Sequence, residues 1–473
     1  MNGFTFQHAA PETQGVPSGA VSEWVRLISE LDTVHSFMLM RHDKIIAQAW
    51  WSPCRPEYKH ELFSLSKSFT SAAIGIAQAE GCLRIDDRLA GFFPEKISAA
   101  VSERMKRVTL RHLLTMSSGH ETCPMSELRP RRDWVKGFLE SSLAFEPGTR
   151  FVYNSAATYM LASVIRRTTG QNVLDYLQER LLHPLGIDAH QWDCCPMGTN
   201  VGGWGFWLRT EDLLRFGRLL QHNGNWEGRQ LIPSDYLREA TSKQIDNSDN
   251  AQPDWKLGYG FQFWRTSFNS FRADGACGQY VLVMPEQDLV LAVTSGVSNM
   301  QSILTHFWNT VYPALRETAL EENPEARKQL ENLLATREIP PVSSALTQQS
   351  RNREYHAAPN TIGLKKLVFH FTEQNCTIVL QWEDGRREEL TARYGIHTRN
   401  LLQLDEEEIR ILEASAAWAD DRTLHVQVAV ETPYRDLYIF RFLGNALEFD
   451  RKSNFGFLHR IWPRITALEE KHG

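Results

Sequence analysis

A serine and a lysine three residues apart, Ser64 and Lys67, have the spacing that most directly suggests chemistry in this chain. They lie in the run Phe63–Phe69, which opens a predicted helix over 64–80 that Gly81 ends. Residues i and i+3 share a helix face, so Ser64 Oγ and Lys67 Nζ can meet. Backbone N–H groups and the positive dipole end at a helix start favour a developing oxyanion. The pattern therefore predicts a nucleophilic serine, with the lysine as base if its surroundings lower the pKa of the ammonium group.

The four-residue pattern is weak alone, because a solvated Ser and Lys on a helix give the same spacing. Two other segments carry groups that could assist. Tyr153 stands at the entry to a predicted helix over 156–168 and could share protons with Lys67; alternatively it is a packing aromatic with a satisfied hydroxyl. The glycine-containing run 273–279 leads into a predicted strand over 280–284, where backbone could come close to a substrate or form a plain turn.

Several longer phrases occur together with these residues. They are 60–69, Leu113-Leu114-Thr115-Met116-Ser117-Ser118-Gly119, Gly202-Gly203-Trp204-Gly205 and 210–217. With Ser64-x-x-Lys67 and a middle motif at Tyr153, they make residues 10–315 resemble the penicillin-recognising serine hydrolases. That family includes class C β-lactamases, D-Ala-D-Ala carboxypeptidases, related esterases and nylon-oligomer hydrolases.

The resemblance implies roles for individual residues. Ser64 would be the nucleophile, and Lys67 and Tyr153 would form a coupled proton-transfer pair. The backbone N–H groups of Ser64 and Ala276 would form the oxyanion hole, and hydrolysis would pass through an acyl-enzyme. No metal and no cofactor is implied.

The chain departs from the family pattern at two places. Ser155 stands where the Y-x-N motif has Asn, and its shorter hydroxyl predicts altered contacts to a substrate amide. Alignment on Gly275 puts Ala273 at the usual Lys or His and Asp274 at the usual Ser or Thr. The cation that would bind a β-lactam carboxylate is therefore missing, and Arg272 should point to the other side of the strand from residue 273. We expect poor penicillinase activity and a preference for an ester, an amide or an amine-bearing oligomer.

Two tryptophans are further substrate-binding candidates. Trp204 and Trp207 lie in a glycine-rich segment where aromatic rings could wall a cleft, with core packing an equal alternative. His120 is more plausibly a packing or surface histidine, and Cys277 lacks a histidine partner in the sequence.

The element pattern predicts an α+β fold. Hairpins over 34–51 and 271–296 flank a mostly helical stretch over 85–240, which indicates a β-lactamase/penicillin-binding-protein-like domain with an antiparallel sheet flanked by helices and a helical subdomain. Residues 1–315 are predicted to form this domain, and 316–350 a helix and linker. Residues 351–473 are predicted to form a β-rich domain, a small antiparallel barrel or sandwich. Its predicted strands are 367–371, 377–382, 424–430 and 437–442.

Composition excludes several classes of protein. A net charge of -6 gives no basic footprint, so nucleic acid is not an expected partner. No stretch is apolar enough to span a membrane, no secretory signal is evident, and the seven cysteines form no CxxC pair. These features favour a cytoplasmic protein with a small-molecule substrate; its oligomeric state is not predicted.

The sequence leaves three functions open. The first is a serine hydrolase acting on an ester or amide, of esterase, D-amino-acid amidase/peptidase or oligomer-hydrolase type. The second is a catalytically weak penicillin-binding or sensing protein of the same fold. The third is a carbohydrate- or partner-binding role in the C-terminal β domain, for which that domain offers no positive feature. A further hypothesis is that this domain covers the active-site mouth and restricts substrate size.

Overall fold

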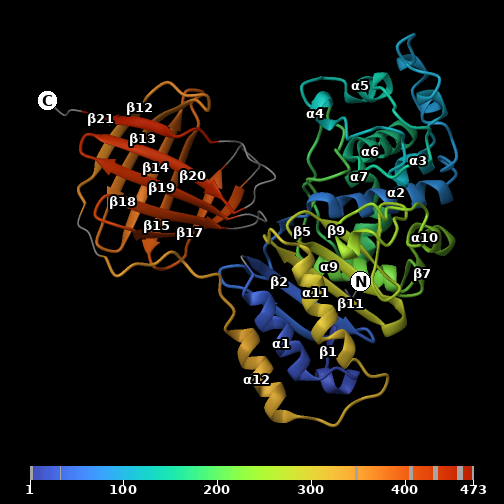
Figure 1. Cartoon of the computed structure of the whole chain (residues 1–473), viewed down its shortest axis with the longest axis horizontal. Coiled ribbons are helices and arrows are strands. Elements are labelled where there is room, and N and C mark those ends of the chain that lie inside the picture. Colours follow the sequence, from blue (N-terminus) through green and yellow to red (C-terminus); the bar gives the residue numbers. More distant parts are fainter. Residues whose placement is uncertain are drawn as a thin grey trace.

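A computed structural model describes residues 4–31, 33–346, 350–403, 409–429, 435–454 and 462–470. These residues build an α+β domain around one sheet and a separate C-terminal β-barrel (Figure 1). The α+β class predicted from the sequence is confirmed, and the choice left open between barrel and sandwich falls to the barrel.

The first domain is organised by a sheet in the order β1-β3-β2-β11-β10-β9-β8. Strands from both ends of the domain meet at its centre, where β2 and β11 pair antiparallel with Phe37 opposite Val293. The two hairpins predicted from the sequence are β2–β3 and β10–β11. The strands are β1 (Gln7–His8), β2 (Val34–Arg41), β3 (Lys44–Trp50), β8 (Trp264–Thr266), β9 (Ser270–Gly275), β10 (Gln279–Met284) and β11 (Leu289–Ser295).

Helices cover both faces of this sheet (Figure 1). α1, α11 and α12 belong to one face, where Trp24 of α1 packs edge-on against Phe37 of β2 and Phe307 of α11. α9 lies on the other face, where Gly217 brings the helix backbone against Val281 and Val290. The bounds are α1 (Ser18–Ser29), α9 (Thr210–Gln221), α11 (Gln301–Thr310) and α12 (Pro324–Ala335).

The helical subdomain adjoins the α9 face. Its central pair is α2 and α6, which pack against each other, and Gly202 of a later loop lies against Ala162 of α6. The bounds are α2 (Ser66–Ala79), α3 (Leu110–Leu114), α4 (Met125–Leu128), α5 (Trp134–Glu140), α6 (Ser155–Thr169), α7 (Val173–Leu177), α8 (His183–Leu185) and α10 (Ser234–Ala240). The short strands are β4 (His60–Glu61), β5 (Trp207–Leu208), β6 (Asn225–Trp226) and β7 (Arg229–Gln230).

The C-terminal strands close into a ring. From β15 the described strands run β14-β13-β12-β21-β20-β19-β18-β17, and a parallel pairing of Tyr394 with Ala416 returns β17 to β15. β16 adds to β17 outside the ring. The bounds are β12 (Arg353–Ala357), β13 (Leu364–Phe371), β14 (Asn375–Trp382), β15 (Arg387–Tyr394), β16 (Thr398–Gln403), β17 (Ile409–Trp418), β18 (Thr423–Ala429), β19 (Asp436–Leu443), β20 (Ala446–Ser453) and β21 (Ile465–Glu469). The predicted strand over 424–430 is β18, and its last residue, Val430, lies outside the described residues.

Aromatic rings fill the barrel, and a few polar contacts join it to the first domain. Phe369 packs edge-on against Phe440 and Phe442 in the interior. Tyr58 Oη donates to Glu413 Oε1 at 3.1 Å. Asn454 Nδ2 donates to the carbonyl oxygen of Gly296, which follows β11, so one end of β20 lies beside the β11–α11 loop.

Candidate functional site

Ser64 and Lys67 meet at the start of α2. Ser64 lies in a 3₁₀ turn over Phe63–Leu65 that runs directly into the helix. Lys67 Nζ is 2.9 Å from Ser64 Oγ, as the i, i+3 spacing predicted. The Ser64 side chain is partly exposed whereas Lys67 is 1% exposed. Ser64 is therefore in contact with solvent while the amine of Lys67 stays out of bulk water.

The surroundings of Lys67 favour its neutral form. Burial lowers the pKa of the ammonium group to about 7, although negative charge on Cys123 or Asp274 would raise it. The carbonyl oxygen of Gly203 accepts a 2.7 Å hydrogen bond from Nζ and fixes the direction of the amine. A Cβ at position 203 would lie 3.3 Å from the carbonyl oxygen of Ser155 and in ordinary contact with Lys67 Nζ, so this loop lies close to both residues.

Tyr153 lies beside the same pair. Its hydroxyl is hydrogen-bonded to Ser64, and Lys67 Nζ lies 5.0 Å from the centre of its ring. The ring stacks on Trp264 at 5.5 Å, which holds it in place. Burial raises the pKa of the phenol, so Tyr153 carries its proton at neutral pH and can donate it. Ser64, Lys67 and Tyr153 are thus brought together from two helix starts.

The end of β9 lies against the 3₁₀ turn that carries Ser64. A side chain at Gly275 would overlap the carbonyl oxygen of Leu62, so strand and turn are in direct backbone contact. The β9–β10 ladder ends at the Gly275–Gln279 pair, which leaves Ala276 beyond the last paired residue and partly exposed. Ala276 thus directly follows the strand residue that contacts the backbone of Leu62.

A buried ion pair, Arg272 with Asp274, flanks Ala273, the residue aligned with the family's cation. Arg272 Nε donates to Asp274 Oδ2 at 2.8 Å, and their side chains are 0% and 6% exposed. Ala273 is fully buried on the opposite face of the strand, in agreement with the alternation expected from the sequence. The negative charge of Asp274 is thus compensated by Arg272 on the same face of the strand. Burial raises the pKa of its carboxyl to about 6, while Arg272 opposes that rise.

Asn154 is a positioning residue that the sequence reading did not single out. Its Oδ1 accepts from the N–H groups of Ala156 and Ala157 at 2.9 and 3.2 Å and so caps α6. Asn is one of the residues preferred at a helix N-cap, so its place directly before α6 is a recognisable capping signal. The cap fixes the helix start that carries Tyr153 on one side and Ser155 on the other. Ser155 is partly exposed and lies against Gly203.

The two tryptophan candidates differ in exposure. Trp204 is partly exposed, lies under the guanidinium of Arg129 and tilts against Trp134, so it can face a substrate. Trp207 is 5% exposed on β5, opposite Glu61, so packing explains it. The sequence predicted either substrate binding or core packing for both tryptophans.

His120 and Cys277 have structural explanations. The two ring nitrogens of His120 bond Ser118 Oγ at 2.9 Å and Ser141 Oγ at 2.7 Å. Burial lowers the pKa of His120 to about 4 and raises the pKa of the Cys277 thiol. Neither is suited to a role as base or nucleophile in this position.

Metal-ligand geometry occurs in the described residues only on the barrel, away from Ser64. Glu354, His356 and Glu470 bring ligand atoms together there, and Lys366 forms an ion pair with Glu354. An ammonium group beside the carboxylate competes with a cation. Within the described ranges, no helix is both long and apolar enough to cross a bilayer.

Comparisons with known proteins identify the family of this chain. The family model described as Beta-lactamase matches residues 24–302, more than half of the chain, and the chain belongs to this family of serine hydrolases. A β-lactamase of Escherichia coli (strain K12) is 24% identical over 156 residues, 33% of this chain and 40% of that protein. The aligned part is thus well under two thirds of the Escherichia coli protein.

Two solved structures share the fold. A putative 6-aminohexanoate-dimer hydrolase from Bacillus anthracis superposes with a TM-score of 0.53 at 19% identity, covering 65% of this chain and 86% of that one. An octameric penicillin-binding protein homologue from Pyrococcus abyssi superposes with a TM-score of 0.51 at 14% identity, covering 95% of this chain and 99% of that one. The second match extends over both domains.

Proposed function

We propose that this protein is a serine hydrolase that cleaves an ester or amide through an acyl-enzyme on Ser64. The observation that carries the proposal is the 2.9 Å contact between Ser64 Oγ and a buried Lys67 whose pKa is lowered to about 7. An ordinary lysine is almost fully protonated at neutral pH and has no lone pair to offer, whereas about half of such a lysine is a free amine at pH 7.

The proposed reaction uses the residues as the geometry arranges them. Neutral Lys67, coupled to Tyr153, takes the Ser64 proton as Oγ attacks the carbonyl carbon of the substrate. The N–H groups of Ser64 and Ala276 stabilise the oxyanion. The bond to the leaving group breaks as Tyr153 donates its proton and regains one from Lys67. Water then attacks the acyl-enzyme with the same pair as base, and Ser64 recovers its proton when the acid leaves.

The substrate is proposed to lack a carboxylate next to the scissile bond. Ala273 offers no charge, and Arg272 is fully buried and already paired with Asp274. Because the pair is neutral overall, it neither attracts a carboxylate nor draws an amine as strongly as a lone Asp274 would. Esters and amides of esterase, D-amino-acid amidase or oligomer-hydrolase type fit this site. We expect negligible hydrolysis of a chromogenic cephalosporin; rapid turnover would refute this specificity.

The test of the proposed function is active-site labelling followed by kinetics. The protein is treated with a fluorophosphonate and digested, and the Ser64 peptide should carry the adduct in the wild type and not in Ser64→Ala. With a p-nitrophenyl ester, a burst of one p-nitrophenolate per chain should precede steady turnover. Labelling without turnover would instead favour the second candidate, a weakly catalytic penicillin-binding or sensing protein. The departures from the family pattern at Ser155 and Asp274 are the observation that supports this candidate.

A further inference from the structure

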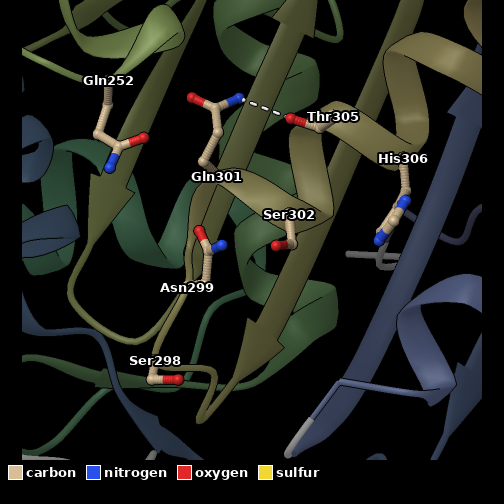
Figure 2. A pocket seen from close by; sticks show the side chains of 7 residues that line it. All are labelled: Gln252, Ser298, Asn299, Gln301, Ser302, Thr305 and His306. Atoms are coloured by element: carbon tan, nitrogen blue, oxygen red, sulfur yellow. Dashed lines mark hydrogen bonds between the residues drawn. The ribbon is translucent and has the colours of Figure 1, made fainter.

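A polar pocket of about 520 Å³ opens at the start of α11, outside the set of residues assigned to catalysis (Figure 2). Apart from His306, no lining residue carries an ionisable side chain. The lining residues are Gln252, Ser298, Asn299, Gln301, Ser302, Thr305 and His306. Its surface therefore offers many hydrogen-bond donors and acceptors but little net charge.

Two carboxamides in this pocket are available to a ligand. In the part of the chain that the structure describes, no hydrogen bond joins the side chain of Gln252 or Asn299 to another group, and both residues are exposed. Figure 2 shows that they enter the pocket from different segments. A carboxamide presents both an N–H donor and a C=O acceptor, so it can pair with an amide group in both directions.

The floor of the pocket, by contrast, is fixed. Gln301 Nε2 donates to Asp254 Oδ2 at 2.6 Å and to Thr305 Oγ1 at 3.2 Å, and its Oε1 accepts from the N–H of Asp254. Asp254 in turn accepts from Arg272 Nη1 through its backbone carbonyl at 2.8 Å. A rigid hydrogen-bonded path thus runs from the pocket floor to the Arg272–Asp274 pair.

The pocket also adjoins the turn that carries Ala276. The N–H of Val297 donates to the carbonyl oxygen of Cys277 at 3.1 Å, which ties the loop before α11 to that turn. Tyr280, which is paired with Asp274 across the β9–β10 ladder, donates through its hydroxyl to the carbonyl of Met300. The segment 297–300 beside the pocket is therefore hydrogen-bonded both to the turn that follows Gly275 and to β10.

We infer that this pocket is an extension subsite that binds an uncharged amide group of the substrate, several bonds from the scissile carbonyl. The inference rests on the proposed function and adds to it the substrate class: linear molecules that carry a further amide beyond the reacting group. Gln252 and Asn299 pair with this amide, while Gln301, held by Asp254, fixes the floor of the subsite.

The test uses the full chain and two series of probes. One is a set of p-nitrophenyl esters whose acyl chains carry no, one or two internal amide groups. The other is a set of amides whose leaving amines are extended in the same way. We expect kcat/KM to rise with the added amide in one series. Gln252→Leu and Asn299→Leu should each remove about fivefold of that gain and leave the shortest ester unaffected. Gln329→Leu on the exposed side of α12 is the matched control.

The outcomes separate the two proposals. If neither series gains from an added amide, or if both leucine variants keep the full gain, the subsite is refuted while turnover of the short ester still supports the hydrolase. If no probe acylates Ser64, the proposed function itself fails. Because both substituted residues are exposed, the variants should unfold at the wild-type temperature, and a thermal melt verifies this.

Discussion

Replacing Lys67 by methionine should stabilise the fold while it removes catalysis. Burial lowers the Lys67 pKa from 10.5 to about 7, which corresponds to a cost of about 5 kcal/mol for keeping this side chain inside at neutral pH. Methionine has a similar length and no charge to desolvate. The substitution also removes the hydrogen-bond donor to the buried carbonyl oxygen of Gly203, which costs about 1–3 kcal/mol. The net expectation is a gain of about 2–4 kcal/mol in the free energy of unfolding at pH 7.

The pH dependence gives this prediction its sign. Below about pH 7 both the folded and unfolded chains carry a protonated Lys67, so the cost is fully present. Between pH 7 and 10.5 the unfolded chain binds more protons, so the wild type gains stability relative to the variant as pH rises. Urea unfolding of the wild type and the variant at pH 7 and pH 10 measures the stability difference and its pH dependence. Lys328→Met, at an exposed position of α12, is the control. A variant less stable than the wild type at pH 7, or a difference that does not shrink at pH 10, would refute the reasoning.

Three further outcomes follow from the same geometry. The rate of Ser64 acylation by an ester should rise about tenfold per pH unit up to about 7 and then level off, because Lys67 must be neutral; an apparent pKa near 10 in the pH–rate profile would contradict this. Asp274→Asn leaves the buried Arg272 without its counter-ion and should cost about 3–5 kcal/mol in thermal unfolding, with a lower KM for carboxylate-bearing esters; an unchanged melting temperature counts against it. Gly275→Ala forces the strand away from Leu62 and should lower kcat/KM for ester hydrolysis at least about 100-fold, and wild-type activity would show that the contact is dispensable.

Local patterns predicted the parts of the site that are local in the chain. The i, i+3 spacing of Ser64 and Lys67 and the strand alternation around Ala273 need only helix and strand geometry, and both hold in the structure. The carbonyl of Gly203 that orients Lys67 lies 136 residues away, and no short-range signal connects the two. The pairing of Arg272 with Asp274 could have been predicted from the sequence, because residues i and i+2 share a strand face.

The same distinction applies to the fold. Both hairpins and four of the ten described C-terminal strands (β13, β14, β18 and β19) were predicted from alternation and turn residues, because each pairs with a neighbouring segment. Closure of the barrel depends on the parallel pairing of β15 with β17, which leaves no mark in the sequence of either strand. The helix predicted within 316–350 is α12, which packs against α1 and β3, a tertiary contact that its sequence alone does not specify.

The role of the barrel stays a proposal with a direct test. Asn454 reaches the Gly296 carbonyl beside the loop that lines the polar pocket, which places the barrel next to the proposed extension subsite. We propose that it restricts the size of substrates. Deletion of 345–473 should then widen the range of esters hydrolysed, and an unchanged range would remove the barrel from the account of specificity.

The most direct test of the central claim is to trap the acyl group of an ester substrate on the protein. The full chain is mixed with a p-nitrophenyl ester, quenched in acid within the burst, and analysed by intact mass and peptide mapping. The account predicts one acyl group per chain, on the peptide containing Ser64, that disappears on further incubation and is absent from Ser64→Ala. Folded protein that carries no acyl group, or carries it on another residue, would contradict the account.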